Sequence, residues 1–332
     1  MAGPVLEAKA LTKHFPVRRG LFARATAVVR AVDDISFAIE PGRTLGLVGE
    51  SGCGKTTTAK LVLLLEQPTA GIMRFEGRDL QTLDSGSLRD YRRSVQAVFQ
   101  DPYASLNPRM RVGSVIAEPL VTNEPLPSAE VRKRILRLLE LVGLPERSAD
   151  LFPHEFSGGQ RQRIAVARAL SLSPKLVVLD EPVSALDVSI RAQILNLLRD
   201  LQAQLGLSYL FIAHDLAAVA HMSHTIAVMY LGKIVEIGEA DTVAKTPKHP
   251  YTQALFSAAL PSHPDEKREE VVVTGEVPSP LAPPSGCHFH PRCPHAMARC
   301  VTEEPALLPE TGRLVACHLY TGVRVGVSVG GR

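Results

Sequence analysis

The sequence predicts an α/β protein, and three apolar segments carry that prediction. Residues 44–48 (TLGLV) run into a glycine-rich turn and then into a helical pattern over 55–65, which is the strand–loop–helix unit of such proteins. Residues 176–179 and 209–213 are apolar throughout, as strands covered on both faces should be. We therefore expect a buried sheet with helices packed against it.

The elements around these strands follow from periodicity. Residues 32–39 alternate like a half-exposed antiparallel strand, and 225–237 read as a hairpin turning at 231–233. Apolar residues of 131–142 recur on one helical face. A further helix is expected to start after Ser157, which can cap it, and to end before Pro174.

Composition excludes several classes of protein. The 332 residues suffice for one large domain and a smaller appendage. The formal net charge is only +3 and the basic residues are dispersed, so no nucleic-acid partner is expected. No apolar run is long enough to span a membrane, and the first ten residues lack a signal-peptide pattern, so we expect the chain to be made and kept in the cytoplasm.

Residues 49–56 (GESGCGKT) match the phosphate-loop pattern G-x-x-x-x-G-K-[ST]. The glycines let backbone N–H groups surround phosphate oxygens, Lys55 neutralises phosphate charge, and the Thr56 hydroxyl ligates Mg²⁺. A glycine-rich turn ending in Lys by chance is the alternative, but the position between a strand and a helix favours nucleoside triphosphate binding. The predicted nucleotide-binding residues here are Gly49, Ser51, Gly52, Gly54, Lys55, Thr56 and Thr57.

Two carboxylates end the strand 176–179. Asp180 is suited to hold the Mg²⁺ shell, and Glu181 is then placed to polarise an attacking water. A strand end that merely reaches solvent is the plainer interpretation of such a pair. The phosphate loop elsewhere in the chain favours the catalytic one.

A second glycine pair opens a helix at 156–160 (FSGGQ), where Ser157 caps a second anion-binding helix end. A simple helix start is the alternative. One nucleotide hardly needs two anion sites from distant parts of one domain. Two copies of the chain, or two homologous chains, can each supply one half of a composite site.

Taken in order, these motifs resemble those of ATP-binding-cassette (ABC) ATPases over Leu11–Gly238. The markers are the phosphate loop, Gln100 within 98–101, the 156–160 segment (with Phe156 where many members have Leu), Asp180–Glu181, Ser184–Asp187 and His214. The resemblance implies a P-loop NTPase cassette over 1–245, with a RecA-like core, an antiparallel β subdomain and a helical subdomain at about 101–172. ATP and Mg²⁺ are the implied cofactors.

The resemblance also implies roles for single residues. Ser157, Gly158, Gly159 and Gln160 reach the γ-phosphate held by the other subunit of a head-to-tail dimer. Glu181, His214 and Gln100 form the catalytic set, and Thr56, Gln100 and Asp180 surround Mg²⁺. Asp187 couples the two sites, and Phe15 stacks on adenine, beside an insertion at 17–30.

Four of the five cysteines, Cys287, Cys293, Cys300 and Cys317, crowd into the last fifth of the chain, where composition changes from about Thr246. We expect a separate small Cys-rich module over 246–332. In a reducing compartment clustered thiols indicate metal ligands rather than disulfides. The spacing C-x5-C-x6-C-x16-C fits no common zinc knuckle, so a [4Fe–4S] cluster or zinc both remain. His288, His290, His295 and His318 lie near enough in sequence for a mixed zinc site.

Residues 103–108, 248–252 and 287–317 narrow the resemblance to the oligopeptide/dipeptide importer branch, and to its F-type ATPase subunit. Members of that branch carry an iron–sulfur cluster on such cysteines; zinc and free buried thiols are the alternatives. The branch implies a peripheral subunit at the cytoplasmic face of the membrane. Its implied partners are a second homologous ATPase, two membrane permease subunits and, indirectly, an extracytoplasmic substrate-binding protein. An importer of nickel or another small solute, or a soluble ABC ATPase of translation or DNA repair, is the alternative function.

Overall fold

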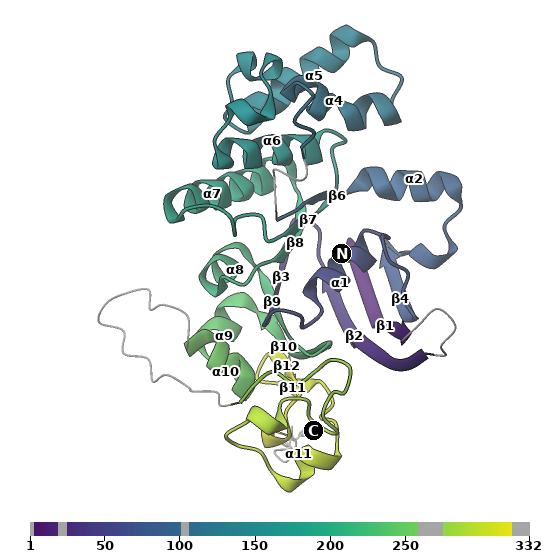
Figure 1. Cartoon of the computed structure of the whole chain (residues 1–332), viewed down its shortest axis with the longest axis vertical. Coiled ribbons are helices and arrows are strands. Elements are labelled where there is room, and N and C mark those ends of the chain that lie inside the picture. Colours follow the sequence, from purple (N-terminus) through teal and green to yellow (C-terminus); the bar gives the residue numbers. More distant parts are fainter. Residues whose placement is uncertain (1–2, 19–24, 101–105, 258–274, 321–332) are drawn as a thin grey trace, which may run out of the picture.

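The computed structural model describes residues 3–18, 25–100, 106–257 and 275–320, which form two β-sheets with helices around them (Figure 1). The four-stranded sheet has the order β2 (Ala25–Ile39), β1 (Leu6–Arg18), β4 (Ala70–Phe75), β5 (Arg78–Asp79), and its strands are antiparallel. The eight-stranded sheet has the order β11 (Leu308–Glu310), β12 (Arg313–Val315), β10 (Lys233–Glu239), β9 (Thr225–Tyr230), β3 (Thr44–Val48), β8 (Ser208–Ile212), β7 (Leu176–Asp180), β6 (Val95–Val98).

The three predicted buried strands are confirmed as β3, β8 and β7, which are neighbours in the large sheet. They run parallel to one another and to the flanking strands β9 and β6. Parallel strands share the edge at which their carboxyl ends lie, so the residues that follow β3, β7 and β8 come together there. This edge carries the phosphate loop, the acidic pair and His214.

Both faces of the large sheet are covered, which explains the uninterrupted apolar strands. In β7, Val177 and Leu179 pack into one core, and Leu176 and Val178 into the other. The first core is shared with the helices of 112–222. The second core also contains the inner face of the four-stranded sheet. The buried side of the helix that follows the phosphate loop packs into this second core.

The helices are α1 (Lys55–Val62), α2 (Ser85–Ser94), α4 (Val112–Asn123), α5 (Ser128–Leu141), α6 (Gly158–Leu170), α7 (Val188–Leu205), α8 (Leu216–Met222), α9 (Ala240–Lys245), α10 (Pro250–Ser257) and α11 (Ala298–Thr302). The three predicted helices are confirmed as α1, α5 and α6. Helices α4, α5 and α6 gather at one end of the long axis of the molecule (Figure 1). Among the described helices, none has the length and apolar composition needed to cross a bilayer.

The predicted hairpin forms from β9 and β10. Leu231 and Gly232 both have positive φ, 42° and 82°, as a two-residue type I′ turn requires. The predicted antiparallel strand 32–39 is the second half of β2, which pairs with β1 along most of its length. Of the insertion at 17–30, residues 19–24 lie outside the described part of the chain.

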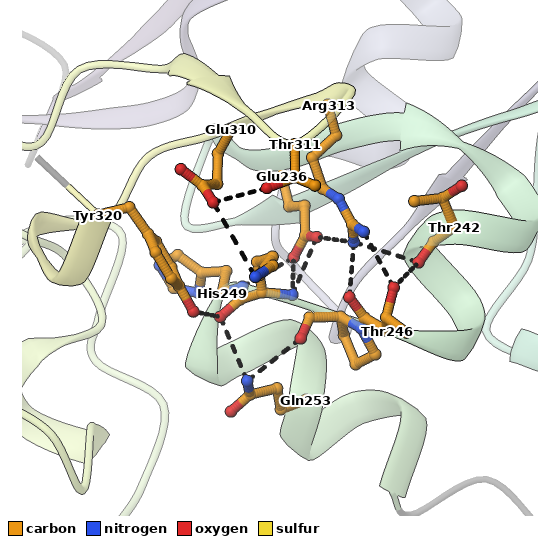
Figure 2. Close-up of polar contacts among 11 residues, drawn as sticks. Glu236, Thr242, Thr246, His249, Gln253, Glu310, Thr311, Arg313 and Tyr320 are labelled. Carbon is orange, nitrogen blue, oxygen red and sulfur yellow. Dashed lines mark hydrogen bonds and ion pairs between the residues drawn. The ribbon is translucent and has the colours of Figure 1, made fainter. Parts of the chain in front are cut away.

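The C-terminal segment is joined to the large sheet. Its strands β12 and β11 add to the edge of β10 and thereby extend the large sheet. The reason lies in a buried ion pair: the Glu236 carboxylate on β10 accepts from Arg313 on β12 at 3.0 Å, and both side chains are almost completely buried. Figure 2 shows this pair at the centre of a polar network that joins β10, the α9–α10 turn and β12.

Candidate nucleotide-binding site

The phosphate loop, residues 49–56, connects β3 to α1. Glycine is required at Gly54, where φ is 114° and a Cβ atom would lie 2.2 Å from the carbonyl oxygen of Ala31. Gly49 is similar, since a Cβ there would lie 2.2 Å from the carbonyl oxygen of Met229. The loop is therefore closely packed between β2 and β9, and its backbone conformation is set by its surroundings.

Lys55 begins α1, and its side chain turns back into the loop. The ammonium donates to the carbonyl oxygens of Gly49 and Glu50 at 2.7 and 2.9 Å, and only 7% of the residue is exposed. The adjoining Cys53 thiol is buried, which raises its pKa, although the charge of Lys55 opposes that shift. The ammonium thus lies where the pattern predicts it, among the backbone groups that would surround a phosphate.

The acidic pair lies at the carboxyl end of β7. Burial raises the pKa of Asp180, the neighbouring Glu181 charge raises it further, and Lys55 and Lys60 act in the opposite direction. The influence of Lys55 places the Asp180 carboxylate within electrostatic range of the loop ammonium. A bound cation would relieve the cost of keeping this buried carboxylate charged.

Glu181 has a φ of 50°, a left-handed conformation that is uncommon for a residue with a side chain. Its N–H donates to the carbonyl oxygen of Ile212 at 2.8 Å, which fixes the turn against β8. His214 follows β8, and its Nδ1 lies 3.5 Å from the Glu181 carboxylate. The structure therefore brings together two of the three predicted catalytic residues, although they are 33 residues apart in sequence.

The third predicted catalytic residue, Gln100, is exposed and lies just after β6, the sheet neighbour of β7. Asp101 and residues 103–105 of the motifs around it lie outside the described residues. Phe15 is half-buried on β1, pairs with Val29 of β2 and has the Lys13 ammonium 4.8 Å from its ring centroid. Val29 is two residues from Ala31, whose carbonyl oxygen lies close to Gly54 of the loop.

Ser157 caps α6 as predicted. Its hydroxyl accepts from the Gln160 N–H at 3.4 Å, and the Gln160 side chain accepts from the Ser157 N–H at 3.0 Å, a reciprocal capping box. A Cβ at Gly159 would lie 2.4 Å from Ile190, so this helix start is packed on α7. Asp187 caps α7 in turn, and its hydrogen bond from the Ile190 N–H holds the pKa of its carboxyl low.

Comparison with known proteins identifies the family of the chain. A profile described as ABC transporter matches residues 32–184, and one described as oligopeptide/dipeptide transporter, C-terminal region, matches 235–300. Over 320 residues, the chain is 51% identical to a probable peptide ABC transporter ATP-binding protein of Sinorhizobium fredii, covering 96% of this chain and 91% of that relative. The chain belongs to the ABC transporter family. The predicted resemblance is thus confirmed.

Two further relatives and one solved structure support the same family assignment for this ABC transporter chain. It is 50% identical to the dipeptide transport ATP-binding protein DppF of Escherichia coli, over 95% of the chain and 94% of the relative. It is 48% identical to the oligopeptide transport ATP-binding protein AppF of Bacillus subtilis, over 96% and 98%. The ATP-binding cassette MJ0796, solved as a dimer in a post-hydrolysis state with ADP and phosphate, matches with a TM-score of 0.62 and 28% identity, over 71% of this chain and 98% of that one.

The four C-terminal cysteines of this ABC transporter chain lie in one region. Burial raises the pKa of Cys287 to about 11, and the other three thiols of the cluster add to that shift. Burial likewise raises the pKa of Cys317 to about 11. The backbone N–H groups two residues further along, in Phe289, His295 and Leu319, lower the pKa of Cys287, Cys293 and Cys317 and so oppose part of the effect of burial.

The ligand geometry of a metal site is nevertheless not formed. Among the described residues, no group of three or more His, Cys, Asp or Glu side chains is arranged to hold a metal ion. Of the nearby histidines, His288 and His290 contact the carbonyl oxygens of Leu231 and Cys287. Four thiols are a donor set suited to a metal held by thiolates, but the arrangement of the described side chains is not that of a metal site.

Two ion pairs near the site were not predicted. Arg191 of α7 donates to the Asp215 carboxylate at 2.7 Å, which joins the helix capped by Asp187 to the turn that follows His214. Arg292 of the C-terminal segment donates to Glu50 of the phosphate loop. No sequence signal marks either pair. For the second pair, Glu50 occupies an x position of the loop pattern, which accepts any residue, and Arg292 is one of several basic residues among the cysteines.

Proposed function

We propose that the chain is the ATP-hydrolysing subunit that powers import of di- or oligopeptides through a membrane ABC transporter. The observation that carries this proposal is the similarity of nearly the whole chain to dipeptide and oligopeptide transport ATP-binding proteins. The match over 235–300 to the C-terminal region of oligopeptide/dipeptide transporters supports the same cargo class. We assign 1–245 to the nucleotide-binding domain, with the helical subdomain at about 101–172, and 246–332 to the C-terminal Cys-rich part.

ATP binding is assigned to the phosphate loop. Backbone N–H groups of Gly49, Ser51, Gly52, Gly54 and the start of α1 face the phosphates, and Lys55 exchanges its carbonyl partners for phosphate oxygens. Thr56, Asp180 and Gln100 would hold Mg²⁺, which neutralises phosphate charge, and Thr57 and Phe15 complete the nucleotide contacts. The raised pKa of Asp180 supports this assignment, since a bound cation would offset the burial and the Glu181 charge that raise it.

Hydrolysis is assigned to Glu181 and His214. Glu181 polarises the water whose oxygen forms the new bond to the γ-phosphorus, while the bond from that phosphorus to the β–γ bridging oxygen breaks and ADP leaves with that electron pair. His214, 3.5 Å from Glu181, contacts the γ-phosphate. Catalysis then depends on positioning and charge neutralisation, because in-line attack requires the water and the γ-phosphate to be held in alignment.

A head-to-tail dimer with a second, homologous ATPase subunit completes each site. The start of α6 lies towards one end of the long axis, and the phosphate loop before α1 lies near its middle, so one chain does not bring its own two anion sites together (Figure 1). In the dimer, Ser157, Gly158, Gly159 and Gln160 reach the ATP held by the partner, and Asp187 couples the two sites. Two permease subunits and an extracytoplasmic substrate-binding protein complete the importer, with this subunit at the cytoplasmic face of the membrane.

We assign a metal site to Cys287, Cys293, Cys300 and Cys317, with a [4Fe–4S] cluster as its content and zinc as the alternative. Their mutual proximity supports thiolate ligation, and the neighbouring backbone N–H groups that lower the pKa of Cys287, Cys293 and Cys317 favour the thiolate form. Absorption spectra of anaerobically purified protein test this assignment. A broad thiolate-to-iron band that is lost in Cys293→Ser supports the cluster, whereas zinc in elemental analysis without that band contradicts it.

The function is tested by an anaerobic pull-down of tagged Glu181→Gln protein with Mg-ATP from detergent-solubilised membranes. Capture of two multi-span proteins and a second cassette ATPase supports the importer. The substrate-binding protein encoded or captured with them then separates peptides from nickel or another small solute, by direct binding of dipeptides or metal. Capture of ribosomal or DNA-repair proteins without a membrane subunit contradicts the proposal and favours a soluble ABC ATPase.

A further inference from the structure

The C-terminal segment reaches the phosphate loop through a bidentate ion pair. The two terminal nitrogens of Arg292 donate to the two carboxylate oxygens of Glu50 at 2.8 and 3.1 Å. The Arg292 side chain is only 9% exposed, and its guanidinium lies 5.9 Å from the ring centroids of both Tyr230 and Phe289. The carboxylate holds the pKa of Arg292 above its usual value, so the guanidinium stays charged. An arginine fork in this geometry fixes orientation as well as distance.

Glu50 is the second residue of the loop, and its main chain is also held on both sides. Its N–H donates to the Tyr251 hydroxyl at 2.8 Å, and its carbonyl oxygen accepts from the Lys55 ammonium at 2.9 Å. Tyr251 in turn packs against Tyr230 and Phe289, with ring centroids 4.7 and 5.4 Å away. Residues that lie more than 200 positions further along the chain therefore hold both the side chain and the backbone of Glu50.

The position of Glu50 makes these contacts relevant to ATP. A phosphate is bound by backbone N–H groups that must converge, so affinity depends on how well the loop conformation is fixed before binding. In the described part of the chain, the hydrogen bonds of the Arg292 side chain go to Glu50 and Tyr230, and none goes to Lys55 or another residue that is assigned to the phosphates. Arg292 acts on the phosphate-binding residues through Glu50, whose carbonyl oxygen accepts a hydrogen bond from the Lys55 ammonium.

We propose that Arg292 is a positioning residue for ATP binding, which holds the phosphate loop in its binding conformation through Glu50. The C-terminal segment thereby sets the ATP affinity of the cassette. Arg292 lies in the short turn between Cys287 and Cys293, so the loop is held from the same turn that carries two of the clustered thiols. The proposal rests on the assignment of residues 49–56 to the phosphates in the proposed function.

The test compares full-length Arg292→Gln and Arg292→Lys with Arg299→Gln. Arg299 is on the same segment and pairs with Glu303, but its side chain is 53% exposed, so its removal is the matched control. ATP Kd is measured by equilibrium binding of a fluorescent ATP analogue, and KM and kcat by steady-state hydrolysis. For Arg292→Gln we expect Kd and KM to rise about tenfold, equivalent to about 1.4 kcal/mol, with the change falling on KM rather than on kcat. Arg292→Lys keeps the charge without the fork and is expected to lie between wild type and Arg292→Gln.

A double-mutant cycle separates positioning from general loosening. Glu50→Gln should raise Kd as Arg292→Gln does, and the double variant should be no worse than either single one, because both remove the same interaction. Glu50→Gln also supplies the answer if Arg292→Gln does not fold. Additive losses, or a wild-type Kd in both single variants, would overturn the proposal.

Lys55→Ala distinguishes this inference from the function on which it rests. If Lys55→Ala weakens ATP binding and the Arg292 and Glu50 variants do not, only the positioning role is wrong. If Lys55→Ala binds ATP like the wild type, the loop assignment fails and the positioning role fails with it.

Discussion

Replacing Arg313 with Met should weaken the docking of the C-terminal segment on the large sheet. Arg313 makes four hydrogen bonds: to the Glu236 carboxylate at 3.0 Å, to the carbonyl oxygens of Thr242 and Thr246 at 3.1 and 2.7 Å, and to the Thr246 hydroxyl at 3.0 Å. Thr246 caps the C-terminal end of α9, so the guanidinium also supplies a donor to a carbonyl oxygen beyond the last helical residue, while the Thr242 carbonyl oxygen accepts from the Thr246 N–H as well. Figure 2 shows these partners arranged around the guanidinium.

The magnitude follows from what remains after the change. The Glu236 carboxylate is fully buried and keeps only the backbone N–H donors of Lys248 and His249, at 2.8 to 3.2 Å. Breaking a buried ion pair by removing one partner costs about 3–5 kcal/mol, because an uncompensated charge stays behind. The remaining N–H donors place this case near the lower limit, so we expect a loss of about 3 kcal/mol.

Hydrogen exchange measures this loss where it occurs. Amides of β12 and β10 should exchange about 100-fold faster in Arg313→Met, since each 1.4 kcal/mol is tenfold. Arg137→Met removes a pair with Glu140 in which both side chains are at least 60% exposed, and it should change exchange little. Glu236→Leu combined with Arg313→Met should recover part of the loss, because no buried charge remains. Unchanged exchange of β12 in Arg313→Met would refute the reasoning.

Three further predictions follow from the site and its surroundings. Glu181→Gln should abolish ATP turnover but still bind ATP and favour a closed dimer. Size-exclusion chromatography with ATP measures the dimer, and normal hydrolysis by the assembled variant would contradict the catalytic role. Lys55→Ala should raise ATP Kd by about tenfold or more, as loss of a charge-assisted contact does, measured by the same fluorescent-analogue titration. Burial lowers the pKa of His249 to about 3, from 6.5 in the unfolded chain, so between these values only the unfolded state binds the proton. The free energy of unfolding should then fall as pH falls from 6.5 towards 3, by up to about 1.4 kcal/mol per unit, and His249→Asn, which keeps an acceptor for the Tyr251 N–H, should flatten that slope in denaturant titrations.

The local parts of the fold were open to prediction because each is specified by a short stretch of sequence. The continuous apolar run 176–179 requires burial on both faces, and β7 lies in the middle of the parallel strands. The capping box at Ser157 and Gln160 sets the start of α6 within one residue. The two-residue turn at Leu231 and Gly232 fixes the register of its hairpin. Glu181 and His214 were predicted separately, and only the parallel order of β7 and β8 brings them together.

The contacts of the C-terminal segment were not open to prediction in the same way. Glu236 and Arg313 are 77 residues apart, and Glu50 and Arg292 are 242 residues apart. Charges at such separations are paired by topology, and no periodicity or spacing records it. The change of composition after residue 246 predicts a separate small module, and it gives no sign that the edge of β10 and the buried Glu236 join the segment to the large sheet.

The two ion pairs of the C-terminal segment act on different equilibria, and this gives a way to tell docking from positioning. Arg313→Met lowers the free energy of opening, but as long as the segment stays docked in more than about 90% of molecules, the apparent ATP Kd changes by only about 10%. Arg292→Gln leaves the buried Arg313–Glu236 pair intact, so β12 should keep its exchange protection while ATP Kd rises. If both variants change both quantities together, the segment affects ATP only by undocking. If each changes its own quantity, the phosphate loop is positioned by a segment that is already in place.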